Sequence, residues 1–313
     1  MSRMLFVAAL GLVGSLWAQG TWAQTRPLQM IVNFPAGAGT DINARALAES
    51  MRQPIGRVFV IVNRAGASGT IGVAALANAA PDGNTVGYVT TIPITLQPHL
   101  IKDVNYAPGD FAPMCRITNN PTTLVVSPQW NFEQVSQIVE RARREPGKLS
   151  IGVPGVHSGP HIAVIEFLLA AKIDIVAVPY AADNAAFPLL KSGDLALAVV
   201  QPQSAKIAGF RVLAVSSRER LAQLPNVPTF TELGYPVVQT ISAGVIGPKG
   251  LAADFVRAME STCRTAHDGA AFQELLGKAG TPTSFAGSGE FTAQIGSEYQ
   301  SMKALAQRLN LKP

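Results

Sequence analysis

Short apolar runs alternate along the chain with segments whose apolar residues recur every three to four positions, as on one face of a helix. Each run is followed by a turn rich in glycine, proline or polar residues, and then by a helical pattern. These runs predict strands at residues 30–32, 58–62, 85–90, 151–153, 175–178 and 196–200. Strands that alternate with helices predict an α/β fold with parallel sheets, in which ligands bind at the carboxyl ends of the strands.

A glycine-rich turn, F-P-A-G-A-G-T-D, follows the first predicted strand, and a helix starts at its end with Thr40 or Asp41. Free backbone N–H groups and the positive end of the helix dipole then meet at one place, which favours an anion. A dinucleotide or phosphate loop is excluded, because both motifs need glycine where the chain has Ile42. A small carboxylate held by backbone donors remains, and an ordinary turn is the alternative. The candidate ligand contacts are Phe34, Ala36, Gly37, Ala38, Gly39, Thr40 and Asp41.

For Asp41 itself we favour a cap on its own helix over contact with an amino group of the ligand, because Asp is a preferred N-cap. The turns at residues 64–70 and 90–94 follow the next two predicted strands and should lie at the same sheet edge. Thr90 and Thr91 can donate to an anion there, and capping is the alternative.

The second half of the chain repeats this order of strand, glycine-rich turn and helix. The turn at residues 154–160 ends with proline in the first turn of the following helix, where proline is favoured. Two anion-binding turns in two halves predict a ligand cleft between two lobes. The candidate contacts from this half are Pro154, Gly155, Ser158, His161, Tyr180 and Gln201. We expect the first lobe to comprise residues 24–124 and 230–313 and the second to comprise residues 125–229, with a hinge near 121–127 and 216–235.

Residues 1–23 have the pattern of a secretory signal peptide, with Arg3, an apolar run and small residues before Gln24. Its removal lowers the net charge from +5 to +4, since Arg3 is the only charged residue lost. We therefore expect a soluble, monomeric periplasmic protein. The one basic cluster, residues 141–144, ends a helical pattern and has no interleaved aromatic residues, so we expect no nucleic-acid partner.

Cys115 and Cys263 lie far apart in the sequence and do not form the disulfide framework of a small secreted domain. Because free cysteine is often simply buried, we expect no bridge between them.

His157 and His161 have the spacing of metal ligands, but Gly159 and Pro160 interrupt the helix that such a pair needs, so we expect no metal or cofactor. The chain also lacks the motifs of a nucleophile elbow or a zinc protease, so we expect no enzyme.

A set of short motifs resembles the Bug-type extracytoplasmic solute-binding proteins of tripartite tricarboxylate transporters. These motifs occur in the family's order along nearly the whole chain after residue 23. They are F-P-A-G-A-G-T-D (34–41), V-N-R-A-G-A-S-G-T-I-G (62–72), A-A-P-D-G-N-T (79–85), D-F-A-P (110–113), K-L-S-I-G-V-P-G (148–155), S-G-P-H (158–161), V-P-Y (178–180) and L-P-N-V-P-T-F-T-E-L-G-Y-P (224–236).

The resemblance implies a two-lobed periplasmic-binding-protein fold of the Venus-flytrap, type II-like kind. It also implies that a small carboxylate is held by backbone amides and waters between the turns at residues 34–41 and 154–161, and is passed to membrane permease subunits. A sensor that signals to a membrane kinase is the alternative. Neighbouring permease genes would favour transport, and neighbouring kinase genes would favour sensing.

The chain departs from the family pattern at residues expected to meet the far end of the ligand. These residues are Tyr180, Ala181, Ala182, Asp183, Gln201 and residues 240–243. They include one acid and no base, so a second ligand carboxylate would lose its hydration there without a cationic partner. We therefore expect a monocarboxylate with an apolar or aromatic body rather than citrate.

Overall fold

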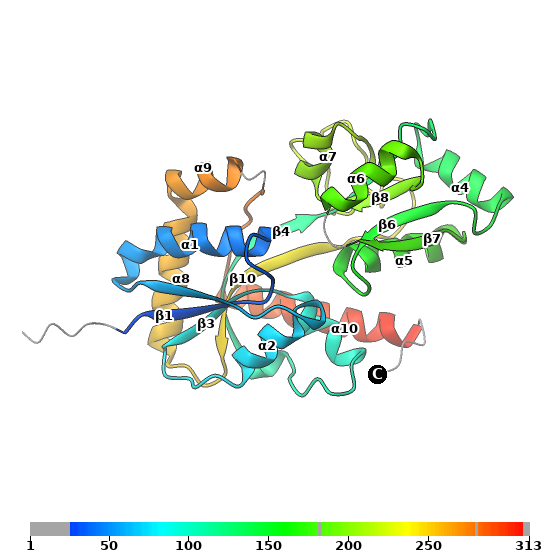
Figure 1. Cartoon of the computed structure of the whole chain (residues 1–313). Helices are drawn as coiled ribbons and strands as arrows, with labels where there is room; N and C mark the ends of the chain where they lie inside the picture. The colour runs from blue at the N-terminus through cyan, green and yellow to red at the C-terminus, as the bar shows by residue number, and fades with distance from the viewer. Residues whose placement is uncertain (1–25, 181–182, 279–280, 309–313) are drawn as a thin grey trace, which may run out of the picture.

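The computed structural model describes residues 26–180, 183–278 and 281–308, which form two sheets that each carry helices on both faces (Figure 1). The expected signal peptide, residues 1–23, lies outside the described residues. The α/β class is confirmed, although both sheets are mixed rather than wholly parallel. Among the described helices, none is both long enough and apolar enough to cross a membrane.

The first sheet has the strand order β11-β4-β10-β3-β1-β2, and we call this half of the molecule the first lobe. Strand β1 pairs in parallel with β2 and β3, whereas β10 runs antiparallel to β3 and β4. The strands are β1 (Leu28–Val32), β2 (Phe59–Asn63), β3 (Thr85–Thr90), β4 (Phe111–Pro121), β10 (Thr240–Pro248) and β11 (Ala286–Gly287). The helices are α1 (Gly39–Ile55), α2 (Thr70–Ala77), α3 (Ile92–Thr95), α8 (Ala253–Asp268), α9 (Ala270–Lys278) and α10 (Ser288–Arg308).

Strand β1 is apolar at successive positions because both faces of the sheet are covered. Met30 and Val32 belong to a buried cluster with Leu47 of α1, whereas Ile31 packs with Val73 of α2 on the other face. Successive side chains of a strand point to opposite faces, so only an unbroken apolar run satisfies both layers.

The second sheet has the order β7-β6-β8-β5-β9 and forms the second lobe. Strand β6 is parallel to β7 and β8, and β5 is antiparallel to β8 and β9. The strands are β5 (Thr123–Val126), β6 (Ser150–Pro154), β7 (Val176–Tyr180), β8 (Leu197–Val200) and β9 (Arg211–Val215). The helices are α4 (Val135–Arg144), α5 (Gly159–Ala171), α6 (Asp183–Ser192) and α7 (Pro202–Ala208).

The chain passes from the first lobe to the second between β4 and β5, and returns at the start of β10. Phe230 and Val237 pack in the second lobe's core, so the return crossing lies close to Gln239. The two crossings meet at Ser216, whose hydroxyl accepts the N–H of Thr122 at 2.8 Å and donates to the carbonyl of Gln239 at 2.6 Å.

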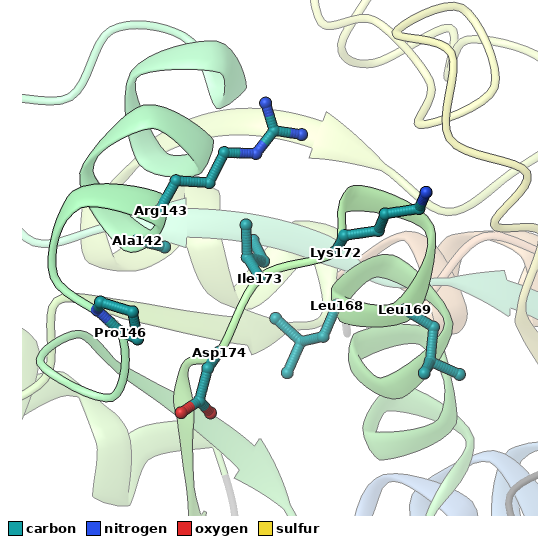
Figure 2. Close-up of a pocket in the computed structure, with 8 residues that line it drawn as sticks. All are labelled: Ala142, Arg143, Pro146, Leu168, Leu169, Lys172, Ile173 and Asp174. Atoms are coloured by element: carbon teal, nitrogen blue, oxygen red, sulfur yellow. The ribbon is translucent and has the colours of Figure 1, made fainter.

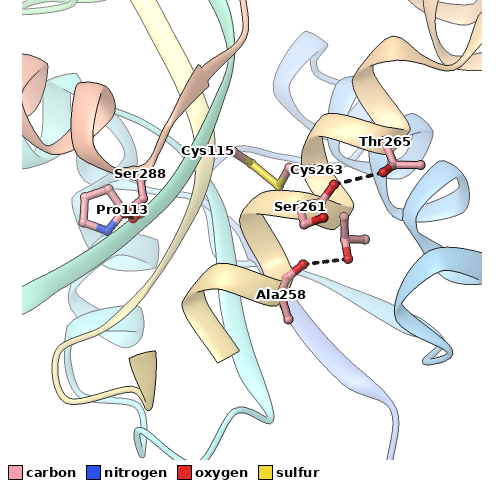
Figure 3. Close-up of a disulfide and its surroundings, with 8 residues drawn as sticks. Pro113, Cys115, Ala258, Ser261, Cys263, Thr265 and Ser288 are labelled. Atoms are coloured by element: carbon pink, nitrogen blue, oxygen red, sulfur yellow. Dashed lines mark hydrogen bonds between the residues drawn. A yellow bond between two sulfur atoms is a disulfide. The ribbon is translucent and has the colours of Figure 1, made fainter. Parts of the chain in front are cut away.

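The two cysteines form a disulfide between β4 and α8, so the expectation that they are free is wrong (Figure 3). Cys115 and Cys263 are fully buried, and their Cα atoms are 6.4 Å apart. Helix α8 packs directly on the sheet at β4, which brings distant sequence positions to bridging distance. The spacing of cysteines along the sequence carries no information about this packing.

Candidate functional site

The first lobe presents three turns at one edge of its sheet. Strands β3, β1 and β2 are adjacent and parallel, so the turns at residues 34–41, 64–70 and 90–94 all follow carboxyl ends of strands. At this edge the buried side chain of Asn33 donates from Nδ2 to the Thr90 hydroxyl at 3.2 Å. The Thr90 hydroxyl oxygen therefore holds two strand ends together, while its O–H can still act as a donor. Thr91, also buried, donates its N–H to the carbonyl of Ser242 on β10 at 2.9 Å.

The turn after β1 exposes the start of α1. Ala36, Gly37 and Gly39 are exposed, while Phe34, Ala38 and Thr40 are half-buried. The N-cap residue, Ala38, provides no side-chain hydrogen bond to the helix. The first N–H groups of a helix have no intrahelical acceptor. The backbone N–H groups in the first turn of α1, which starts at Gly39, are therefore donors that an anion can bind.

Asp41 organises this turn from inside. It is 2% exposed, and its carboxylate accepts hydrogen bonds from the N–H of Gly37, from Arg45 Nε and from Asn63 Nδ2, each at 2.9 Å. It therefore ties the preceding loop to α1, which differs from the cap on its own helix that we expected. Burial raises the pKa of Asp41, but the hydrogen bonds from Arg45, Gly37 and Asn63 outweigh this effect and lower the pKa below its ordinary value.

Asn33, Arg45 and Asn63 support the turn but were missing from the candidate residues. Asn63 also donates from Nδ2 to the carbonyl of Phe34 at 3.0 Å, so it connects the end of β2 to both sides of the turn. The available signal was a polar residue that closes an apolar run, because Asn33 follows β1 and Asn63 ends β2.

The second lobe has a matching edge, where β7, β6 and β8 end in parallel. In the turn after Pro154, the N–H of Gly155 donates to the carbonyl of Tyr180 at 3.1 Å. Ser158 caps α5 by accepting the N–H of His161 at 3.3 Å, and its hydroxyl donates to the Gly155 carbonyl at 3.0 Å. The structure therefore brings Pro154, Gly155, Ser158 and His161 together in one tightly bonded turn.

His161 is held in one orientation by this turn. Its Nδ1 accepts the N–H of His157 at 2.9 Å, and the two imidazole rings lie 6.0 Å apart. Burial, and then the charge of His157, lower the pKa of His161, which favours the neutral ring. Because Nδ1 is an acceptor, the proton of the neutral ring lies on Nε2, which becomes a donor for a water or a carboxylate.

Tyr180, Asp183 and Gln201 form a second group at this edge, at the ends of β7 and β8. The Tyr180 hydroxyl donates to the carbonyl of Val199, and the Gln201 N–H donates to Asp183 Oδ2 at 2.9 Å. Burial raises the pKa of the Asp183 carboxyl. Ala181 and Ala182 lie outside the described residues.

The two edges meet beside the crossing strands. A Cβ placed on Gly159 would lie 3.5 Å from side-chain carbons of Ile92 and Ile241, and Ile162 of α5 packs in a cluster with Ile92 and Leu305 of α10. The turn of the second lobe therefore lies against the turn that follows β3 in the first lobe.

A separate surface hollow of about 490 Å³ lies on the second lobe, between the carboxyl ends of α4 and α5 (Figure 2). It is lined by side chains that include Arg143, Leu168, Lys172 and Asp174. None of the candidate ligand contacts lies in it, because it sits at the helix ends rather than at the strand ends.

Comparisons with known proteins find related sequences and related solved structures. A model of the protein family described as "Tripartite tricarboxylate transporter family receptor" matches residues 43–311. Protein BugT of Bordetella pertussis is 30% identical over 79% of this chain and 77% of its own length. The solved structure of R. palustris Rpa4515 with adipate has a TM-score of 0.80 at 25% identity, over 93% of this chain and 99% of that one. The periplasmic binding protein BugD has a TM-score of 0.77 at 25% identity, over 91% of this chain and 98% of that one.

Proposed function

Because the chain belongs to the tripartite tricarboxylate transporter receptor family, we propose that it captures a small carboxylate between its lobes and delivers it to membrane permease subunits. In this proposal it works as a periplasmic monomer that is exported by the signal peptide at residues 1–23. It releases its ligand unchanged rather than acting as an enzyme.

The observation that carries the proposal is the uncapped start of α1 at an exposed strand edge. The Gly37 N–H already donates to the Asp41 carboxylate. The donors available to the ligand are therefore the backbone N–H groups in the first turn of α1, starting with that of Gly39. Hydrogen bonds from neutral N–H groups to a carboxylate are charge-assisted, and a site without arginine can therefore still bind an acid well. His161 Nε2 is the donor that the second lobe contributes.

A thermal-shift screen of small mono-, di- and tricarboxylates against residues 24–313 tests the proposal. A ligand that binds only the folded protein raises the melting temperature by mass action. We expect at least one acid to do so and to be recovered unchanged after incubation. If no acid raises the melting temperature, carboxylate capture is wrong, and if the acid is consumed, the chain is an enzyme. Loss of uptake of that acid in a strain that lacks this protein tests delivery.

A further inference from the structure

We infer, on the basis of the proposed carboxylate capture, that the far end of the ligand is a hydrogen-bond donor and not a second carboxylate. The chain then selects small monocarboxylates, as the sequence predicts, but ones that carry a hydroxyl or amino group rather than an apolar group at the end opposite the carboxylate. The inference rests on the acceptors gathered at the ends of β7 and β8.

Three acceptor groups lie at this place, and the hydrogen bond from the Gln201 N–H to Asp183 joins two of the residues that carry them. Asp183 begins α6, directly beyond β7, and Gln201 and Gln203 lie at the junction of β8 and α7. The Oε1 atoms of Gln201 and Gln203 are buried and have no hydrogen-bond partner among the described residues. A buried acceptor that lacks a donor destabilises the protein, so a ligand that supplies the donor binds more tightly.

The same place lacks a positive charge to hold a second carboxylate. Among the described residues, no basic side chain forms an ion pair with Asp183, and Lys206, further along α7, is exposed. The groups that do contact the Asp183 carboxyl are the hydroxyls of Ser204 and Tyr180 and the N–H of Gln201.

A second carboxylate would therefore meet the Asp183 acid, and the glutamine amides would offer it only uncharged N–H donors. Carboxylates that share a site disfavour each other's charge, and removing one from water is costly without a paired cation. A hydroxyl or ammonium group on the ligand would donate to these acceptors, and its hydrogen bond to the Asp183 carboxylate would be charge-assisted. The Asp183 carboxyl, with no basic partner among the described residues, thus distinguishes the two classes of ligand by charge.

Calorimetric titration with chain-matched acids tests the inference. One series is adipate, hexanoate, 6-hydroxyhexanoate and 6-aminohexanoate, and a shorter series is succinate, butyrate, 4-hydroxybutyrate and 4-aminobutyrate. We expect a hydroxy or amino acid to bind at least about tenfold more tightly than both its diacid and its unsubstituted partner, a difference of about 1.4 kcal/mol. If the diacid binds most tightly in both series, the inference is overturned while carboxylate capture stands. If the unsubstituted acid does, the far end is apolar and the inference is equally overturned. If no acid in either series or in the wider screen binds, the proposed function itself has failed.

Two variants connect the preference to the residues. Asp183→Asn removes the charge, so the amino acid should lose at least about tenfold in affinity relative to the diacid. Asp194→Asn, a change at an exposed acid of the same lobe, should leave the ratio unchanged. Gln201→Leu removes one acceptor and should reduce the advantage of the hydroxy acid, which gives a second measurement if Asp183→Asn does not fold. An unchanged ratio in a folded variant would contradict the assignment.

Discussion

Gly37 and Gly39 stand two positions apart in the first turn and meet different constraints. Gly37 has a φ of +80°, a left-handed conformation that other residues rarely adopt, whereas Gly39 is the first residue of α1. A Cβ on either residue would find no other atom within 4 Å. Gly37 is therefore needed for backbone conformation, and Gly39 is needed only if something must approach it closely.

We expect Gly39→Val to weaken carboxylate binding at least about tenfold, because the new side chain would crowd the free N–H groups. The melting temperature of the empty protein should hardly change, as for most substitutions away from packed contacts. Gly37→Val is the matched comparison and should destabilise the empty protein by about 1–2 kcal/mol through its left-handed backbone. Equal loss of apo stability in both variants would show that Gly39 is a structural residue and not a ligand contact.

Asp41 makes a second residue-scale prediction. Its pKa is lower in the folded protein, so its stabilising effect is complete above the unfolded pKa and disappears as the pH falls through the folded one. At pH 7, Asp41→Asn should lower the free energy of unfolding by about 1–3 kcal/mol, because three donors lose a charged acceptor. The difference from wild type should shrink when urea unfolding is measured near pH 3. Asp103→Asn, at an exposed acid of the same lobe, should show neither effect.

At the scale of elements, buried parallel strands were predictable and β4 was not. The apolar runs at residues 30–32, 85–90 and 151–153 lie within β1, β3 and β6, because strands covered on both faces keep an unbroken apolar pattern. Strand β4 contains Pro113 and Pro121, which argue against a strand in sequence. Both prolines nevertheless stand in this strand, which β11 borders only at Cys115 and Arg116.

The candidate site was predictable to a similar degree. Glycine-rich turns mark strand ends in the sequence, so the grouping of three turns at one edge followed from parallel pairing alone. The hydrogen-bond partners of Asp41 could not be predicted in this way. Asn63 is 22 residues from Asp41 in the sequence and reaches it only through the register of β2 beside β1. Contacts that depend on register have no local pattern in the sequence.

The disulfide gives the prediction at this scale. It closes a long stretch of chain, since its cysteines are 148 positions apart, and cross-linking of this kind stabilises mainly by restricting the unfolded chain. Replacing both Cys115 and Cys263 by alanine should lower the free energy of unfolding by about 2–5 kcal/mol. Carboxylate affinity should change little, because both cysteines lie within the core rather than at the strand-end turns. Chemical unfolding with and without a reductant provides the measurement. Equal stability of the oxidised and reduced wild type would contradict it.

At the scale of the whole molecule, two cores are joined by two crossings that meet at one buried hydroxyl. Ser216 is fully buried, and its backbone N–H and C=O also bond to Thr122 and Gln239, at 2.9 Å each. Both crossings are thereby fixed to each other at the junction of the two lobes. Helix α10 extends from the first lobe toward α5 of the second (Figure 1), and Met302 and Leu305 of α10 share a buried cluster with Ile162 of α5. Rotation of the lobes must keep these contacts or slide along them.

We expect ligand binding to close the lobes about this junction. Small-angle scattering should show a smaller radius of gyration with a saturating acid than without one, because the proposed carboxylate donors come from both lobes. Ser216→Ala should lower the free energy of unfolding by about 1–3 kcal/mol, since it leaves the Thr122 N–H without its acceptor. It should nevertheless leave the ligand-induced decrease in radius intact, because the hydroxyl joins the crossings to each other and not one lobe to the ligand. A tightly bound acid that leaves the radius unchanged would exclude closure. Loss of the decrease in a folded Ser216→Ala protein would instead show that this hydroxyl guides the rotation.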